Sequence, residues 1–175
     1  MRLGFESGGR VGFDQLASIS RAAPGFYINP IQEFLMPTNT QMINASRLNS
    51  HQRVRHTANL FGVNFPLILE PTVFAIAGRL SASYRGGFWD FHSLSNGGFY
   101  MAPSGDTASF GVIAENGFEG VMPGDAFGVT VCLYAYSALS FKPGPFAEVC
   151  AEHYHLLRAF AIDRPDWAAI GRAID

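Results

Sequence analysis

The chain has 175 residues, of which 48% are hydrophobic and 15% charged, and its formal net charge is −2 at pH 7. This length and composition predict one globular domain with a sizeable core. The nearly balanced charge argues against a basic protein that tracks nucleic-acid phosphates, and equally against an acidic mimic of DNA. Two cysteines, Cys132 and Cys150, have no disulfide or zinc-site pattern and fit a reducing, cytoplasmic setting.

Charge is divided unevenly along the sequence. Residues 1–85 carry eight arginines and four acidic residues, whereas residues 86–175 carry four basic and ten acidic residues. We expect the two halves to attract each other within one fold. The alternative is an acidic face that binds a basic partner.

The first 39 residues are rich in Gly, Pro, Ser and Asn and show no sustained hydrophobic periodicity. We interpret residues 1–39 as an N-terminal arm or extension, and residues 40–175 as the patterned domain. The N-terminus has no apolar run typical of a signal peptide. The longest apolar stretch, residues 126–141, is shorter than the roughly 18–20 residues that span a bilayer, so we expect a core helix and no membrane segment.

The first predicted elements are a short strand at residues 40–45 and a helix over residues 51–61. Asn49 or Ser50 is suited to cap that helix, and Gly62 is suited to end it. A second helix is predicted within residues 66–84, where apolar residues recur at helical spacing. Its first turn contains Pro71, and its C-terminal end carries Arg79 and Arg85.

The segment GGFWDFHSLSNGGFYMAP, residues 86–103, predicts a β-hairpin. Asn96-Gly97 is typical of a tight hairpin turn, and residues 98–102 form the return strand. Alternation divides the side chains of the first strand between two faces, with Trp89, Phe91 and Ser93 on one and Phe88, Asp90, His92 and Leu94 on the other. A strand at residues 108–114 and a second turn at Asn116-Gly117 follow, so we expect an antiparallel meander of three to four strands.

Three helices are predicted in the remainder of the chain. The first covers residues 122–141, is capped by Asp125 or Gly124, and has one apolar face formed by Val129, Leu133, Tyr136 and Leu139. The second covers residues 146–162, and the third is capped by Asp163 with Pro165 in its first turn. Because helices come before and after the grouped strands, the fold class is α+β, a single domain with several helices packed on the meander.

Few residue patterns indicate catalysis or cofactor binding. His153 and His155 are two apart on a predicted helix and cannot bind one metal ion together, and no glycine pair leads into a phosphate-binding helix. Asp90 and His92, with Ser93 or Ser95, have the residue types of a hydrolase, but Ser93 points to the opposite face. Aromatic side chains on the sheet leave nucleic-acid stacking as another alternative.

A local basic cluster is formed by Arg47, Arg53 and Arg55. We interpret it as the solvated face of a helix. The functional alternative is a docking patch for an acidic partner.

The segment YRGGFWDFHSLSNGGFYMAP, residues 84–103, resembles the signature of the KlcA/ArdB antirestriction family. Residues 45–62, 116–135 and 153–175 are similar to further family segments in the same order, so the resemblance covers residues 40–175. Residues 1–39 have no counterpart. The run at 51–60 is poorer in Arg and Pro than the family pattern, and His92 stands where a tyrosine is common.

The resemblance implies a protein of plasmids or other mobile elements that relieves DNA cleavage by type I restriction–modification systems. We expect it to contact the restriction complex or an associated host factor, without catalysis, cofactors or strong DNA binding. The exposed hairpin residues and the acids beside the second turn are the expected contacts: Asp90, His92, Asn96, Glu115 and Glu119. The alternatives are a hydrolase-type enzyme that uses Asp90 and His92, or a nucleic-acid-binding protein.

Overall fold

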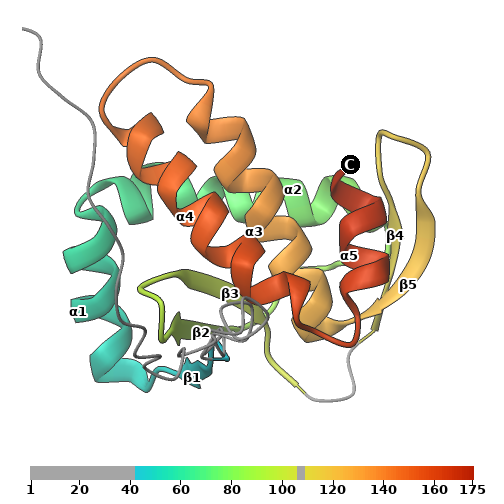
Figure 1. Ribbon diagram of the computed structural model, residues 1–175, viewed down its shortest axis with the longest axis horizontal. Helices are drawn as coiled ribbons and strands as arrows, with labels where there is room; N and C mark the ends of the chain where they lie inside the picture. The colour runs from blue at the N-terminus through green and yellow to red at the C-terminus, as the bar shows by residue number, and fades with distance from the viewer. Residues whose placement is uncertain (1–41, 106–108) are drawn as a thin grey trace, which may run out of the picture. The chain divides into compact units, whose positions relative to one another are not determined.

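A computed structural model describes residues 42–105 and 109–175 of the chain; the expected arm, residues 1–39, lies outside these ranges. Helices precede and follow the strands (Figure 1), which confirms the α+β class. The elements are, in chain order, β1 (Ala45–Arg47), α1 (Ser50–Phe61), the π-helix η2 (Phe65–Leu69), α2 (Glu70–Leu80), β2 (Trp89–Leu94), β3 (Phe99–Pro103), β4 (Ser109–Ile113), β5 (Glu119–Pro123), α3 (Gly124–Ser140), α4 (Phe146–Ile162) and α5 (Trp167–Ile174).

The strands form two separate antiparallel sheets. One has the order β1-β2-β3, and the other consists of β4 and β5. The predicted β2–β3 hairpin is present, and its connection has three residues, Ser95, Asn96 and Gly97, because Leu94 and Gly98 are hydrogen-bonded; Gly97 has a φ of 90°. The predicted strands are therefore present, but they belong to two sheets rather than to one meander. The first of them lies at Ala45–Arg47 instead of residues 40–45.

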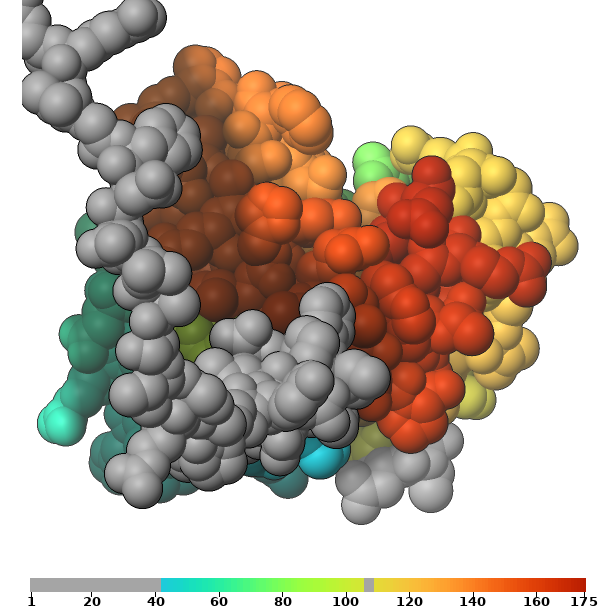
Figure 2. Space-filling model, in the orientation of Figure 1, coloured from blue at the N-terminus to red at the C-terminus, as the bar shows by residue number. Residues whose placement is uncertain are grey.

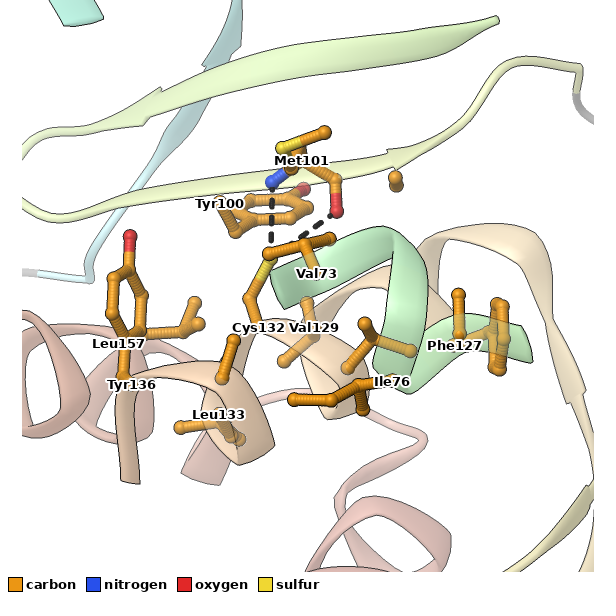
Figure 3. Close-up of a cluster of buried hydrophobic side chains, with 14 of the residues drawn as sticks. Val73, Ile76, Tyr100, Met101, Phe127, Val129, Cys132, Leu133, Tyr136 and Leu157 are labelled. Atoms are coloured by element: carbon orange, nitrogen blue, oxygen red, sulfur yellow. Dashed lines mark hydrogen bonds between the residues drawn. The ribbon is translucent and has the colours of Figure 1, made fainter. Parts of the chain in front are cut away.

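The outer edge of β3 is covered by α3, so in the described residues no further strand pairs there. Three residues of α3, spaced four apart, approach the β3 backbone: Gly128, Cys132 and Tyr136. The amide of Met101 donates a hydrogen bond to Sγ of Cys132 at 3.4 Å (Figure 3), and the Tyr136 hydroxyl donates to the carbonyl oxygen of Phe99 at 3.0 Å. A helix thus closes a sheet edge that would otherwise remain open.

The core is centred on α3. Twelve of its 17 residues are buried, which leaves no solvent-facing stripe of the kind a surface helix has. The predicted apolar face is buried, and so is most of the opposite side, because α3 contacts α2, α4, α5 and β3. Cys132 is buried as a small hydrophobic residue, and burial raises the pKa of its thiol to about 12.

The predicted start and end of α1 are confirmed. The side chain of Asn49 accepts a hydrogen bond from the amide of Gln52 at 3.0 Å and caps α1, and Gly62 follows the helix with a φ of 57°. The predicted caps of two later helices are wrong. The residue before α3 is Pro123 and the residue before α5 is Asp166, neither with a side-chain cap, and Asp163 instead ends α4.

A π-helical turn precedes α2, which begins at Glu70 with Pro71 in its first turn as predicted. Pro71 has no amide hydrogen to donate to the carbonyl oxygen of Leu67, so the wider π turn fits this position. In the described part of the chain, no single helix is long and apolar enough to cross a membrane. Together, α1 and the helical run 65–80 have the length and apolar composition of a membrane-crossing segment, but the two helices are bent by 92° relative to each other.

Candidate functional site

Two of the expected contact residues, Asp90 and His92, lie on one face of β2 because they are two positions apart. Oδ1 of Asp90 is 2.7 Å from Nη2 of Arg47, a residue of the neighbouring strand β1. The side chain of Arg47 is 67% exposed, so this ion pair lies at the surface and contributes little to stability.

The His92 ring lies flat on the ring of Tyr100, its direct partner on β3. The ring centroids are 4.6 Å apart and the ring planes are inclined by 9°. Burial lowers the pKa of His92, against the opposing effects of Asp125 and Asp90. His92 is therefore a neutral, stacked ring at pH 7 rather than a cation.

Tyr100 connects this face of the sheet to α3. Its hydroxyl donates a hydrogen bond to Oδ1 of Asp125 at 3.0 Å. Burial raises the pKa of Tyr100 well above its ordinary value, and the carboxylate of Asp125 adds to this effect. The hydroxyl therefore stays protonated and acts as a hydrogen-bond donor.

Arg164, in the α4–α5 connection, binds two carboxylates. Its Nη2 lies 2.8 Å from Oδ2 of Asp125, and its Nε lies 2.8 Å from Oδ1 of Asp166. Burial alone would lower the pKa of Arg164, but the hydrogen bond to Asp166 and the charge of Asp125 outweigh it and raise that pKa. We call the surface formed by Arg47, Asp90, His92, Asp125 and Arg164 the β2 patch.

A hydrolase arrangement is not assembled in the described residues. No hydrogen bond there links Asp90 to His92, and the Ser93 hydroxyl donates to the carbonyl oxygen of Ser46 at 3.4 Å. A nucleophilic serine needs a base within hydrogen-bond reach. The same residues contain no group of three or more His, Cys, Asp or Glu that could hold a metal ion. The β2 patch offers charged and hydrogen-bonding groups for recognition.

Asn96 lies in the turn of the same hairpin and binds other parts of the chain. Its Nδ2 donates a hydrogen bond to the carbonyl oxygen of Leu156 in α4 at 2.8 Å. Its Oδ1 accepts a hydrogen bond from the amide of Gly98 at 3.1 Å. The nitrogen of this half-buried side chain therefore holds the turn against α4, and the oxygen stabilises the turn itself.

Glu115 and Glu119 lie on the second hairpin, apart from the three-stranded sheet. Both side chains are exposed, and Oε1 of Glu115 is 3.4 Å from Nε of Arg79. This hairpin lies beside α5, as the yellow and red surfaces in Figure 2 show, and Nδ2 of Asn116 donates to the carbonyl oxygen of Arg172. The structure thus brings Asp90 and His92 together and places the two glutamates on a different sheet.

Sequence reasoning did not identify Tyr100 and Arg164 as members of the site, and it assigned Asp125 to a helix cap. Their sequence separation is the reason, since Tyr100 and Asp125 are 25 residues apart. One local feature of the sequence does indicate a role for Arg164. Asp166 is only two positions away, and the two side chains form two charged hydrogen bonds.

Comparison with known proteins shows similarity to antirestriction proteins. A family model described as "Antirestriction protein" matches residues 82–175. The chain is 42% identical over 135 residues to an antirestriction protein KlcA of Escherichia coli, which covers 75% of this chain and 92% of that protein. A second Escherichia coli KlcA is 35% identical over 142 residues, covering 80% of this chain and all of that protein.

A solved structure is also similar, with a TM-score of 0.72 and 36% identity, covering 80% of this chain and all of the other. It comes from work on the KlcA and ArdB proteins, described as having a novel fold and antirestriction activity against type I DNA restriction systems in vivo but not in vitro. The identities and the coverage show the family as well as the fold. The chain therefore belongs to the KlcA/ArdB family of antirestriction proteins.

Proposed function

We propose that this protein relieves DNA cleavage by type I restriction–modification systems through protein contacts, without catalysis and without imitating DNA. It would act in the cytoplasm on the restriction complex or on an associated host factor. The activity described for the KlcA and ArdB proteins, in vivo but not in vitro, supports this proposal. An inhibitor that works only in cells fits a mechanism that needs a further cellular component.

The observation that carries the protein-contact mechanism is the pairing of the acids around the β2 patch. Asp90 pairs with Arg47, and both Asp125 and Asp166 pair with Arg164. A DNA mimic must displace DNA with a dense array of negative charge. Carboxylates that are neutralised by neighbouring arginines support recognition of another protein instead.

We assign the partner contacts to Asp90 and His92 in the β2 patch and to Glu115 and Glu119 on the second hairpin. Asn96 contributes by holding the β2–β3 turn in place. The two acidic residues of the second hairpin are exposed and suit a basic region of the partner.

The proposal is tested by the plating efficiency of unmodified phage on cells that carry a type I system. Cells that express the protein should plate the phage more efficiently than cells with an empty vector, whereas equal plating would overturn the proposal. A gel-shift series with the purified protein at two ionic strengths tests the DNA-binding alternative. Tight binding that weakens steeply with salt would indicate direct phosphate contacts.

A further inference from the structure

An apolar groove lies on the side of β2 opposite Asp90 and His92. Its floor is the ring of Phe91, whose side chain alternates with theirs along the strand. One wall is α1, with Arg53, Val54 and Ala58, and the other wall contains Val63 from the turn after α1 and Pro66 in the first turn of η2. The groove has a volume of about 710 Å³. We call it the α1 groove.

Large apolar side chains at the rim of the groove remain exposed to solvent. The exposed fraction is 73% for Val54, 71% for Val63 and 72% for the neighbouring Leu67. Contiguous apolar surface bordered by polar groups marks an interaction site in a folded protein. A small molecule confined to the groove would leave these rims in water, so the occupant is larger than the groove itself.

One wall carries the positive charge of Arg53, and the acidic residue Glu70 also lines the groove without forming an ion pair with it. The Arg53 guanidinium lies 4.1 Å from the centre of the Phe91 ring, and its Nη2 donates a hydrogen bond to the carbonyl oxygen of Trp89 at 2.9 Å. Among the described residues Arg53 forms no ion pair. A fixed guanidinium with free donors is suited to a partner's carboxylate.

We propose that the α1 groove is a docking site for an amphipathic α-helix of a partner protein, with a carboxylate on that helix pairing with Arg53. The groove runs beside a 12-residue helix, about 18 Å long, which matches three turns of a partner helix. Helices bind such grooves with apolar anchors at positions i, i+3 or i+4 and i+7. A concave surface favours this occupant over a membrane, which flat or protruding apolar faces contact.

This proposal rests on the proposed function, because it assigns the groove to the partner through which restriction is relieved. Val54→Glu should place a charge on the apolar rim, weaken docking at least about tenfold, which is about 1.4 kcal/mol, and lower phage plating. Phe141→Glu, just after α3, is the control, since Phe141 is 86% exposed and lies outside the groove, the β2 patch and the second hairpin, and it should keep the wild-type plating. Both changes are on the surface, and thermal unfolding checks that both variants fold.

The occupant itself is identified by site-specific cross-linking in the same cells, with a photoreactive benzoylphenylalanine at position 54 or at position 141. A protein adduct that forms at 54 and not at 141, and that maps to a helical segment with a carboxylate, supports the proposal. That segment, made as a peptide, should bind at least about tenfold more weakly to Arg53→Met, which keeps the packing on Phe91 but loses the charge.

Each of the following results would overturn the docking proposal: no adduct at 54, an adduct with a second copy of this chain, a peptide indifferent to Arg53→Met, or binding to phosphatidylglycerol vesicles that Val54→Glu abolishes. Failure of the proposed function has a different outcome. In that case the wild-type protein gives no relief of restriction although the adduct forms at position 54. If relief is normal and survives Val54→Glu, only the docking proposal fails.

Discussion

The side-chain amide of Asn96 donates a hydrogen bond to the carbonyl oxygen of Leu156, 2.8 Å away, and so connects the β2–β3 turn to α4. The second hairpin repeats the arrangement, because Nδ2 of Asn116 donates to the carbonyl oxygen of Arg172 at 2.9 Å. In each turn the Asn oxygen also accepts the amide hydrogen two residues ahead. Both Asn-Gly turns therefore shape a hairpin and attach it to a C-terminal helix.

Replacing Asn96 by Ala should lower the free energy of unfolding by about 1–3 kcal/mol, because the Leu156 carbonyl and the Gly98 amide lose their partner. Chemical denaturation measures the change. Asn59→Ala, on the exposed surface of α1, is the control and should change stability by no more than about 0.5 kcal/mol. Equal effects of the two substitutions would show that the hydrogen bonds of Asn96 do not contribute to the free energy of unfolding.

Gly128→Ala should strongly destabilise the fold. The new Cβ would lie 2.6 Å from the carbonyl oxygen of Met101 and against Ala102, so α3 would have to move away from β3. Overpacking of this kind costs about 1–3 kcal/mol or more. Gly78→Ala in α2 is the matched control, since nothing lies within 4 Å of a Cβ there, and it should raise stability by up to about 1 kcal/mol. Similar thermal midpoints for the two variants would contradict the close α3–β3 contact.

His153 should make stability depend on pH. Its ring lies 4.6 Å from that of Phe61, its Nδ1 has no hydrogen-bond partner among residues 42–105 and 109–175, and burial lowers its pKa, with Glu152 opposing and His56 adding to the shift. The folded state therefore binds fewer protons than the unfolded state. The contribution is fully present above the ordinary histidine pKa of about 6.5 and is lost as the pH falls below it.

His153→Phe keeps an aromatic ring at this position and removes the titrating group. The free energy of unfolding, measured from about pH 7.5 to pH 5, should fall less in this variant than in the wild type. His155→Phe, on the exposed side of the same helix, controls for the added phenyl ring. A pH slope that is unchanged in His153→Phe would rule out this residue as a source of acid sensitivity.

His92→Phe separates partner contact from catalysis. Phenylalanine preserves the stacking on Tyr100 but has no nitrogen to transfer a proton. We expect most of the relief of restriction to survive, because the proposed contact is spread over several residues. Complete loss of phage plating, with an unchanged melting temperature, would instead favour the hydrolase alternative.

Local signals in the sequence predicted much of the fold. The two Asn-Gly turns, the Asn49 cap and the glycine after α1 act within a few residues of where they stand, so the sequence alone identifies them. The predicted cap at Asp125 failed because Tyr100 and Arg164, distant in sequence, bind its carboxylate. Local capping preference was overridden by tertiary contacts.

The sequence pattern also did not predict that the strands form two sheets, because that division depends on contacts between residues distant in sequence. Alternation shows which residues face inward, but it does not show that α3 covers the edge of β3. The candidate site was predicted in part, since Asp90 and His92 do lie together, whereas Tyr100 and Arg164 come from other elements. The opposite charges of the two halves do meet, in the ion pairs Arg47–Asp90 and Arg79–Glu115.

The most direct test of the protein-contact account is phage plating with a variant that changes all four proposed contacts: Asp90→Asn, His92→Phe, Glu115→Gln and Glu119→Gln. Glu148→Gln and Glu152→Gln on α4, with Asp163→Asn at its end, change exposed residues and remove three negative charges, as many as the fourfold variant does, and so control for that loss. With expression and unfolding transitions matched, the fourfold variant should lower the plating efficiency of unmodified phage at least about tenfold relative to the wild type, and the control should not. Wild-type plating by the fourfold variant would contradict the account.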